Sequence, residues 1–333
     1  MPYNYQLLFV AYNAGQAGAT LTMELIRGLH NLRSRHRGCV ATVGNLDGVH
    51  LGHQAVLGQL AEKAAELRLP SVVVTFEPQP QEFFARTTPP PRLTRLREKL
   101  QALRRFAVDR VLCVRFDSAF AAMAPDGFVQ SLLVDGLGVQ YLVVGDDFRY
   151  GHRRQGDFAT LQAAGDRYGF RVVNMHTFNV DGERVSSTRI REALAGGNMG
   201  MAEKLLGRPY RMSGRVVRGD RRGRQLGFPT ANIHLHRRTS PVSGVFAVEV
   251  FGLDREPVAG AANVGVRPTV DGTRSLLEIH LLDFDGDIYS RYVQVDFLKK
   301  LRNEQRFESL EQLKRKIAAD VEQARQFFGL SGG

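Results

Sequence analysis

The spacing of hydrophobic and polar positions changes once along the chain, near residue 207. Between Gly38 and about Ile190, apolar runs alternate with stretches of helical spacing. The apolar runs cover residues 39–44, 71–76, 110–116, 141–145 and 170–175, and the helical patterns cover residues 53–67 and 94–106. Such alternation is typical of a parallel sheet with helices on both faces. We therefore expect an α/β N-terminal domain with a doubly wound parallel sheet.

A different pattern follows a helical stretch at residues 187–206. Short runs rich in β-branched and aromatic residues are separated by Gly, Pro and Asp, at residues 213–219, 244–252, 260–265, 275–284 and 292–300. This composition predicts antiparallel strands that form a small β-barrel. Apolar residues at three-and-four spacing in residues 309–328 predict an amphipathic helix that closes the barrel.

The length supports two domains, because 333 residues exceed the size at which one core usually stops growing. We predict an N-terminal domain at residues 23–206 and a C-terminal domain at residues 207–330. Residues 1–22 form an uncertain leader, since the apolar run Leu7 to Tyr12 lacks the basic region of a signal peptide. Met23 would make a sensible translation start, a hypothesis that an intact mass of the native protein tests.

Composition narrows the class of protein. The apolar fraction of 43% and the charged fraction of 24% are typical of soluble globular proteins. Every apolar run is far shorter than the roughly 20 residues that cross a bilayer, so we expect no membrane partner. Cys39 and Cys113 lie in apolar runs without metal-ligand spacing, which favours a reduced, cytoplasmic location.

The net charge of +11 suits ligands that carry phosphates as well as it suits nucleic acid. The basic residues are scattered, with local clusters at Arg153–Arg154 and at residues 221–224, and we interpret them as a solvated face. We therefore expect small-molecule partners and no nucleic acid. A homo-oligomer is compatible with the sequence.

A glycine-rich turn with two histidines directly follows the first predicted strand, at residues 44–53. A helix beginning near Gly52 would point backbone N–H groups and its positive end at the crevice above the sheet, where a triphosphate fits. His50 and His53 can then donate hydrogen bonds to phosphoryl oxygens as charge develops. The alternative is that the histidines only cap the helix.

Two further segments are rich in polar groups. Residues 185–191, VSSTRIR, open a helix with three hydroxyl groups and two arginines, which alone make only a good N-cap. Residues 145–151, GDDFRYG, follow another predicted parallel strand. The turn and the SSTRIR segment together resemble the HxGH and ISSTxxR elements of the nucleotidyltransferase superfamily, and GDDFRYG resembles the GxDFxFG loop of bacterial FAD synthetases. Tyr150 replaces the usual Phe of this loop, Leu46 replaces the usual Phe of the GxFDGVH pattern in the histidine turn, and both keep apolar bulk.

The C-terminal half has its own motifs. Residues 223–232, GRQLGFPTAN, offer glycine N–H groups for phosphates and hard oxygen ligands for Mg²⁺ in Thr230 and Asn232. Standing alone, the segment is equally compatible with a plain hairpin turn. It closely resembles the GRxLGFPTAN signature of riboflavin kinase, residues 263–269 resemble the family's NIGxRPT, and residues 277–284 resemble its acidic strand, with Glu278 as the general base. Without the resemblance, a solvent-facing glutamate on an edge strand is the simpler interpretation.

The resemblance covers nearly everything from Met23 to Leu330 and is to the bacterial bifunctional riboflavin kinase/FAD synthetase family. It implies phosphorylation of riboflavin to FMN by the barrel and adenylylation of FMN to FAD by the α/β domain, with ATP as co-substrate and Mg²⁺ as cofactor. The implied catalytic residues are Glu278, His50 and His53. In the adenylyltransferase, ATP would contact Gly44, Asp47, Gly52, Ser187, Thr188 and Arg191, and the flavin Asp147 and Phe148. In the kinase, ATP and flavin would contact Gly219, Gly227, Phe228, Pro229 and Arg267, and Mg²⁺ would bind Thr230 and Asn232.

Three alternatives fit parts of the sequence. An adenylyltransferase for another phosphate, such as a phosphopantetheine or nicotinate enzyme, does not account for the PTAN and NVGVRPT segments. A nucleic-acid-binding barrel would need exposed aromatics with interleaved lysines, whereas the barrel's Phe and Tyr residues mostly lie in apolar runs. A class I aminoacyl-tRNA synthetase would need a KMSKS-type loop, and the similar residues 211–213 precede a strand, so we interpret them as a chance match.

Overall fold

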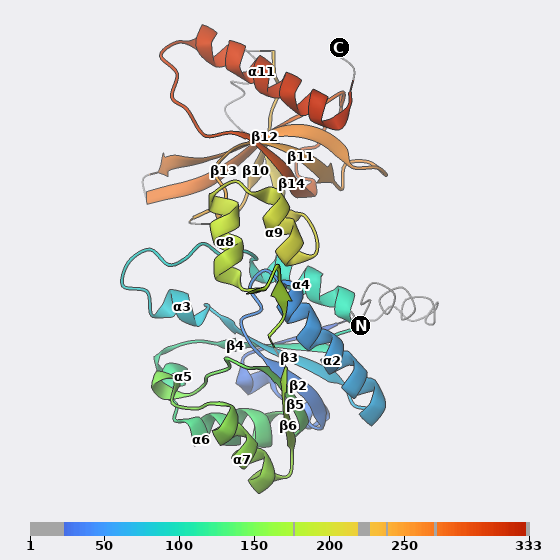
Figure 1. Ribbon diagram of the computed structural model, residues 1–333, viewed down its shortest axis with the longest axis vertical. Coiled ribbons are helices and arrows are strands. Elements are labelled where there is room, and N and C mark those ends of the chain that lie inside the picture. Colours follow the sequence, from blue (N-terminus) through green and yellow to red (C-terminus); the bar gives the residue numbers. More distant parts are fainter. Residues whose placement is uncertain (1–22, 176, 219–226, 238, 270–271, 331–333) are drawn as a thin grey trace.

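The computed structural model describes residues 23–175, 177–218, 227–237, 239–269 and 272–330. For residues 266–269 and 272–274 it describes only the backbone. Two bodies are stacked along the long axis of the molecule, a sheet flanked by helices below and a β-barrel above (Figure 1). The two predicted architectures are therefore confirmed.

The lower body is built on a six-stranded sheet with the order β1-β4-β3-β2-β5-β6, and every strand pair in it is parallel. Its strands are β1 Glu24–Arg27, β2 Cys39–Val43, β3 Ser71–Glu77, β4 Arg110–Arg115, β5 Val139–Gly145 and β6 Arg171–Met175. The chain leaves β2 toward β3 and β4 and returns to β5 on the other side of β2. A crevice opens at such a point of reversal, outside the carboxyl ends of β2 and β5.

Helices cover both faces of this sheet, because its strands are apolar on both sides. On one face α2 (Leu51–Leu67) and α4 (Leu96–Leu103) pack through a core that includes Leu57, Leu60 and Leu103. The other face is covered by helical segments between β4 and β6, whose core residues include Leu132 and Leu161. These segments are α5 Ser118–Ala121, α6 Pro125–Phe128, a π-helical segment Val129–Gly136 and α7 Phe158–Tyr168. Shorter elements of the lower body are α3 Pro80–Phe83, β7 Asn179–Val180, β8 Glu183–Arg184 and 3₁₀ turns at Leu29–Asn31, Ser34–His36, Arg104–Phe106 and His152–Arg154.

Several features differ from the sequence-based expectation, including the barrel strand β10 (Ala231–His234), which was not predicted. Strand β1 was not predicted, because its four residues, ELIR, are too few to show a period. The helical stretch at residues 187–206 is two helices, α8 Ser187–Ala195 and α9 Met199–Leu206. Gly197 breaks it with φ +79°, a conformation that favours glycine, and Asn198 then caps α9 by accepting a hydrogen bond from the Met201 N–H at 3.0 Å.

The upper body is a closed antiparallel barrel with the order β10-β13-β12-β11-β14-β9. Closure leaves no unpaired sheet edge. The strands are β9 Tyr210–Val217, β10 Ala231–His234, β11 Gly244–Phe251, β12 Val258–Thr269, β13 Gly272–Leu281 and β14 Tyr292–Arg302. Helix α11 (Leu310–Phe328), predicted as an amphipathic helix, packs over the barrel wall through Ala324, which is buried with Ala247 and Ala261 (Figure 1).

One hydrophobic cluster extends from helices α8 and α9 into the barrel, beside the separate cores on the two faces of the sheet. Helices α8 and α9 lie between the sheet and the barrel (Figure 1), and their buried residues Ile190 and Leu205 belong to the same cluster as Val248 and Phe297 of the barrel. Gln54 of α2 also donates a hydrogen bond to the Leu206 carbonyl at 2.7 Å. The predicted domain boundary at residues 206 and 207 therefore falls at the end of a helix that packs on both bodies.

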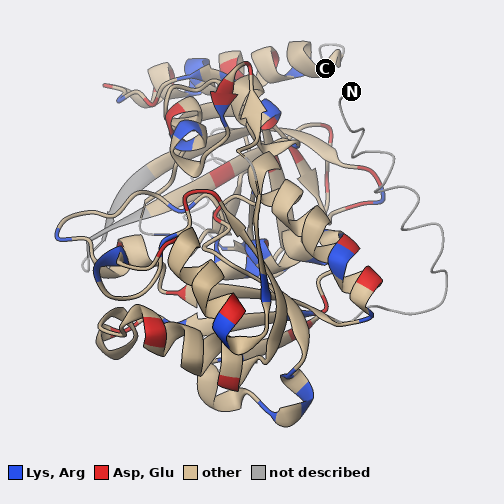
Figure 2. Cartoon of the chain, turned by 60° about the horizontal axis from the view of Figure 1, so that its bottom comes forward, with Lys and Arg blue, Asp and Glu red and all other residues tan. Residues whose placement is uncertain are grey.

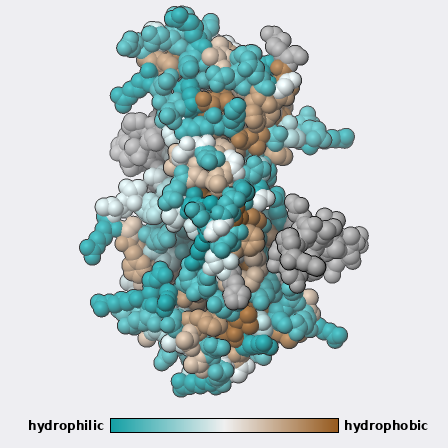
Figure 3. Space-filling view, in the orientation of Figure 1, coloured by the Kyte–Doolittle hydropathy of each residue, from teal (hydrophilic) through white to brown (hydrophobic). Residues whose placement is uncertain are grey.

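The face drawn in Figure 3 is mostly hydrophilic. Figure 2 shows Lys and Arg interspersed with Asp and Glu, and Figure 3 shows hydrophobic residues in small patches among hydrophilic ones. Among the described residues, no helix is long and apolar enough to cross a membrane.

Candidate active site

A cavity of about 650 Å³ opens at the carboxyl ends of β2 and β5. Its walls include every residue that the sequence assigned to the N-terminal site: Gly44, Asp47, His50, Gly52, His53, Asp147, Phe148, Ser187, Thr188 and Arg191. Residues from segments about 140 positions apart in the chain thus meet around one space. The location agrees with the general rule for ligand sites in doubly wound sheets.

His50 and His53 stack at the start of α2. Their ring centroids are 3.6 Å apart with an angle of 18° between the planes. His50 is the N-cap, and its Nδ1 accepts a hydrogen bond from the His53 backbone N–H at 3.4 Å. A Cβ on Gly52 would lie 3.3 Å from the His50 ring, so glycine leaves this imidazole its room. The capping role that the sequence offered as an alternative is real, and it fixes the His50 proton on Nε2.

Both histidines are neutral near pH 7. Burial lowers the pKa of His50 from 6.5 to about 4, more than the Asp47 carboxylate raises it. Burial, with the nearby His50 and Lys99, holds the pKa of His53 well below its usual range. A neutral imidazole still has one N–H to donate, so the pair offers hydrogen bonds to an anion without carrying charge.

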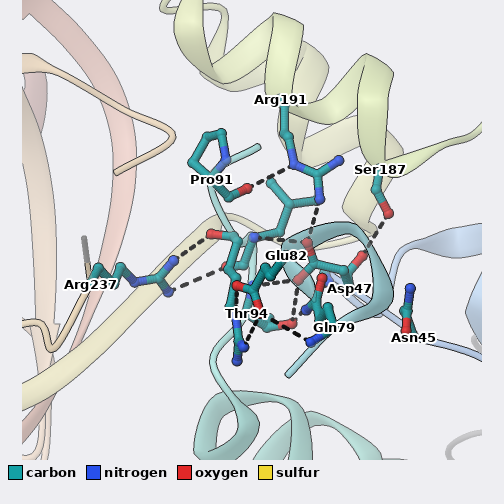
Figure 4. Close-up of polar contacts among 12 residues, drawn as sticks. Asn45, Asp47, Gln79, Glu82, Pro91, Thr94, Ser187, Arg191 and Arg237 are labelled. Atoms are coloured by element: carbon teal, nitrogen blue, oxygen red, sulfur yellow. Dashed lines mark hydrogen bonds and ion pairs between the residues drawn. The ribbon is translucent and has the colours of Figure 1, made fainter. Parts of the chain in front are cut away.

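Asp47 holds several segments of the site together (Figure 4). Its buried carboxylate accepts hydrogen bonds from the backbone N–H of Leu93 at 3.1 Å and of Thr94 at 2.9 Å, and from the Thr94 hydroxyl at 3.1 Å. It also accepts one from the Arg191 guanidinium at 2.6 Å. The contacts of Asp47 are therefore to the protein, and they place Arg191 at the cavity wall.

The N-terminus of α8 forms the opposite wall. Ser186 caps the helix by accepting a hydrogen bond from the Arg189 N–H at 3.2 Å, so the hydroxyl groups of Ser187 and Thr188 lie in its first turn. The Ser187 hydroxyl donates to the Asp47 carbonyl at 3.0 Å and joins this helix to the histidine turn. The first turns of α2 and α8 both contribute to the cavity, and helix N-termini favour anions.

Aromatic side chains line the rest of the cavity. The rings of Phe148 and Tyr150 are 5.8 Å apart and nearly parallel, at 17°. The remaining aromatic lining residues are Phe76, Phe84, Phe116, Phe120, Phe128 and Phe178. One cavity thus combines an anion-binding end with a surface suited to a planar ring system.

Charged side chains from the loop after β5 and from β8 lie at the rim. Arg184 pairs with Asp147 at 2.7 Å and with Asp146 at 3.4 Å. Arg153 and Arg154 also line the cavity. Both arginines are exposed, as expected for a solvated face, and they also lie against the cavity.

Sequence reasoning named His53 but missed Asn45, Gln79 and Lys99. Asn45 Oδ1, His53 Nδ1 and Gln79 Nε2 are buried, line the cavity and have no hydrogen-bond partner in the described part of the chain. Lys99, with an exposed fraction of 1%, donates to the Thr75 hydroxyl at 3.1 Å behind the histidines. Asn45 and Gln79 follow the carboxyl ends of β2 and β3, a position that could have identified them.

Two of the predicted C-terminal residues, Glu278 and Asn232, lie side by side in the barrel wall. In the strand register, Glu278 of β13 lies directly opposite Asn232 of β10 on one side and Asn263 of β12 on the other. Directly opposed residues share a face of a sheet. The neighbours Leu277 and Ile279 belong to the buried core, so Glu278 and the two asparagines face outward as one row.

The PTAN segment leads into this row. The Phe228 ring packs edge-on against His280 at 5.6 Å, and the Pro229 carbonyl lies 2.9 Å from His280 Nδ1. Thr230 directly precedes β10, and Gly227 has φ +87°. Gly219 lies outside the described residues, as does the side chain of Arg267. Of the predicted metal ligands, Asn232 is buried and Thr230 half-buried.

Residues 211–213 lie inside strand β9. Arg211 forms an ion pair with Asp296 of β14, and Ser213 donates its backbone N–H to Glu98 at 3.0 Å. These contacts lie within the barrel and between the barrel and helix α4.

Comparisons with known proteins match the two halves of the chain to two different family models. A family model described as FAD synthetase matches residues 32–189, and one described as riboflavin kinase matches residues 206–328. A curated bifunctional riboflavin kinase/FMN adenylyltransferase of Escherichia coli (strain K12) is 56% identical, covering 93% of this chain and 99% of its own length. A protein of the same description from Pseudomonas fluorescens is 55% identical over 91% of this chain and 97% of its own. A solved structure described as a macrolide-efflux protein from Streptococcus pneumoniae has a TM-score of 0.78 at 30% identity and covers 91% of this chain and 99% of that one.

Proposed function

The chain belongs to the family of bifunctional riboflavin kinases/FMN adenylyltransferases, and from this we propose how its residues divide the two reactions. It makes FMN from riboflavin and FAD from FMN. We assign FMN adenylylation to residues 23–206 and riboflavin phosphorylation to residues 207–330. The observation that carries the assignment is that all the predicted N-terminal residues line one cavity, whereas Glu278 and Asn232 share a face of the barrel.

For the adenylyltransferase we propose that ATP occupies the anion-binding end of the cavity. The fit rests on the first turns of α2 and α8, on Arg191, and on the buried polar atoms of Asn45, His53 and Gln79 that lack protein partners. A phosphate oxygen of FMN forms a bond to the α-phosphorus of ATP, and the bond to pyrophosphate breaks. His50 and His53, as neutral N–H donors, stabilise the charge that develops on the phosphoryl oxygens.

The flavin would lie against the aromatic part of the same cavity. Phe148 was predicted to contact it, and the near-parallel Tyr150 extends that surface. Asp147 is held by Arg184 at the rim, where it can orient a polar edge of the flavin. Gly44 and Gly52 let the nucleotide approach the backbone, and the Thr188 hydroxyl adds a donor beside the phosphates, whereas the Ser187 hydroxyl holds the Asp47 carbonyl.

For the kinase we propose that Glu278 takes the proton of the riboflavin 5′-hydroxyl. In the same step the 5′-oxygen of riboflavin forms a bond to the γ-phosphorus of ATP, and ADP leaves. Gly219, Gly227, Phe228, Pro229 and Arg267 stay predictions for contacts with ATP and flavin.

We propose that Thr230 and Asn232 hold Mg²⁺ in the kinase. Their oxygens are hard donors, and Mg²⁺ commonly takes only one or two protein ligands with the remainder from phosphates and water. Bound Mg²⁺ would neutralise charge on the phosphate oxygens. We also propose a cytoplasmic location, supported by the two cysteines, which are buried and free.

Chromatographic separation of flavins tests the co-substrate and the order of reactions. The purified chain is incubated with riboflavin, ATP and Mg²⁺, and in parallel with FMN in place of riboflavin. We expect FMN and then FAD in the first mixture, FAD at once in the second, and neither product without ATP or with excess chelator. Product formation without ATP would remove ATP as the donor, and full rates in chelator would remove Mg²⁺.

A further inference from the structure

One short segment joins the barrel to the adenylyltransferase cavity. Residues 91–98, here called the bridging segment, lie between the two bodies and contact both (Figure 4). Arg237, from the loop between β10 and β11, donates to the Arg92 carbonyl at 2.5 Å and to the Leu93 carbonyl at 3.4 Å. Tyr210 of β9 donates its hydroxyl to the Leu93 carbonyl at 3.1 Å. The barrel therefore holds two consecutive carbonyl groups of this segment.

The other side of the same two peptide groups faces the cavity wall. The Arg92 carbonyl and the Leu93 N–H belong to one peptide group, and the Leu93 carbonyl and the Thr94 N–H belong to the next. Both N–H groups donate to the Asp47 carboxylate, at 3.1 and 2.9 Å. A peptide group is planar, so fixing its carbonyl also fixes the direction of its N–H. Hydrogen bonds on both sides of a peptide group also polarise it and strengthen one another.

Asp47 connects the bridging segment to Arg191 at the cavity wall. Its carboxylate accepts from the Arg191 guanidinium at 2.6 Å, and Arg191 also donates to the Pro91 carbonyl at 2.7 Å. Arg191 is thus held by the bridging segment directly and through Asp47. The chain of contacts runs from Arg237 through two peptide groups to the guanidinium at the cavity wall.

Burying the charged side chain of Arg237 costs desolvation free energy that an apolar side chain in the same place would not. Its side chain is 2% exposed and pairs at 2.5 Å with Glu98, whose side chain is 6% exposed. A buried ion pair is often no more stabilising than apolar side chains of similar volume. Arginine suits this position because its guanidinium has several N–H groups in a fixed plane. It can therefore hold both carbonyl groups and the Glu98 carboxylate in fixed orientations.

We propose that Arg237 and Tyr210 of the kinase barrel are positioning residues for FMN adenylylation, acting through the bridging segment and Asp47 on Arg191. The inference rests on the proposed adenylyltransferase site. It means that the N-terminal site is complete only with the barrel docked on it, although both residues lie outside the cavity lining.

The test measures the two reactions separately in the full-length chain. Tyr210→Phe removes one hydrogen bond to the Leu93 carbonyl and keeps the packing of the ring. Arg237→Met combined with Glu98→Gln removes Arg237's contacts with both carbonyls without leaving the Glu98 carboxylate buried and unpaired, although Arg95, 16% exposed, loses its ion pair with Glu98 at 3.6 Å. The matched control is Arg302→Met with Asp320→Asn, which removes a similar ion pair, with side chains 15% and 6% exposed, between β14 and α11.

We expect Tyr210→Phe to lower kcat/KM for FMN adenylylation by about 3- to 10-fold and the Arg237/Glu98 double variant to lower it by about 10- to 100-fold. The KM for ATP should rise in adenylylation only. Riboflavin phosphorylation should stay within about twofold in both variants, and both reactions should do so in the Arg302/Asp320 control.

Two results would overturn the inference. One is unchanged adenylylation in both variants. The other is a parallel loss of both activities with unchanged KM for ATP, since a merely structural role reduces the amount of folded enzyme for both reactions alike. Failure of the proposed site is a separate result: the His53→Ala variant would then make FAD from FMN at the wild-type rate.

Discussion

The Arg191 guanidinium lies 2.6 Å from the Asp47 carboxylate, although 144 positions separate the two residues in the chain. The pair joins the histidine turn after β2 to helix α8, and its side chains are 13% and 4% exposed. Neither motif would place its polar groups without the other. The cavity is therefore built by contacts between its two sequence motifs as well as by each motif itself.

Asp47→Asn should impair both stability and FAD formation. The amide offers one acceptor oxygen and puts an N–H₂ group beside the donors of Leu93, Thr94 or Arg191. Removing one partner of a buried ion pair costs about 3–5 kcal/mol, which urea denaturation would show as a lower free energy of unfolding. We expect kcat/KM for FMN adenylylation to fall by about 10²-fold, because Arg191 loses its position.

Lys204→Met is the control for this prediction. It removes an exposed ion pair with Asp181 at 2.6 Å and should change the free energy of unfolding by less than about 1 kcal/mol. Wild-type stability in Asp47→Asn would show that the carboxylate is not needed to hold these segments.

The buried His50 should make stability depend on pH. Burial lowers its pKa to about 4, whereas the unfolded chain protonates this group near 6.5. Between these values the unfolded state binds a proton that the folded state does not, so the free energy of unfolding falls as pH falls from 6.5 to 4. This group contributes on the order of 3 kcal/mol to the change.

His50→Gln isolates this contribution. Glutamine can still accept the His53 N–H but does not titrate. Urea denaturation of both proteins from pH 7 to pH 4 should show the stability advantage of the wild type shrinking as pH falls. A constant difference across this range would mean that His50 keeps an ordinary pKa in the folded protein.

The sequence predicted the parts of this molecule whose signal is local. The strand β2 with its histidine turn, the barrel strands other than β10, and α11 were predicted because each has a period or a motif of its own. Strand β1 is too short to show a period, and Arg153 and Arg154 carry no local sign that they lie against a cavity. Arg237 shows the same limit most clearly, since its partners Arg92 and Glu98 lie well over 100 positions away.

Phe84→Ala tests the aromatic part of the cavity. Phe84 lines the cavity but is 62% exposed, and its ring meets Phe116 at 5.7 Å. Because it is mostly exposed, its loss should change the free energy of unfolding by no more than about 0.5 kcal/mol. If the flavin stacks there, the KM for FMN in adenylylation should rise about 5- to 10-fold, the equivalent of one aromatic contact of about 1 kcal/mol.

Phe327→Ala provides a matched control, because Phe327 is 41% exposed on α11, on the barrel rather than at the cavity. Its KM for FMN should equal that of the wild type. An unchanged KM in Phe84→Ala as well would place the flavin against other lining residues.

Glu278→Gln should separate the two activities. The substitution keeps the size and outward position of the side chain in the row with Asn232 and Asn263 but removes the base. Riboflavin phosphorylation should fall by about 10²-fold or more, the usual contribution of general base catalysis, while FAD formation from supplied FMN should stay near the wild-type rate.

His53→Ala should give the opposite result, with FAD formation reduced about 10²- to 10³-fold and FMN formation retained, because each loss is confined to one site.

Glu249→Gln is the control for the loss of charge in Glu278→Gln, since Glu249 is half-buried on β11 of the same barrel. A kinase rate in Glu278→Gln equal to that of Glu249→Gln would remove Glu278 as the base. Loss of both reactions in either active-site variant would mean that the two sites are not independent. In that case Arg237 and Tyr210 would be the first residues to test as the physical link, because their contacts connect the barrel to Asp47.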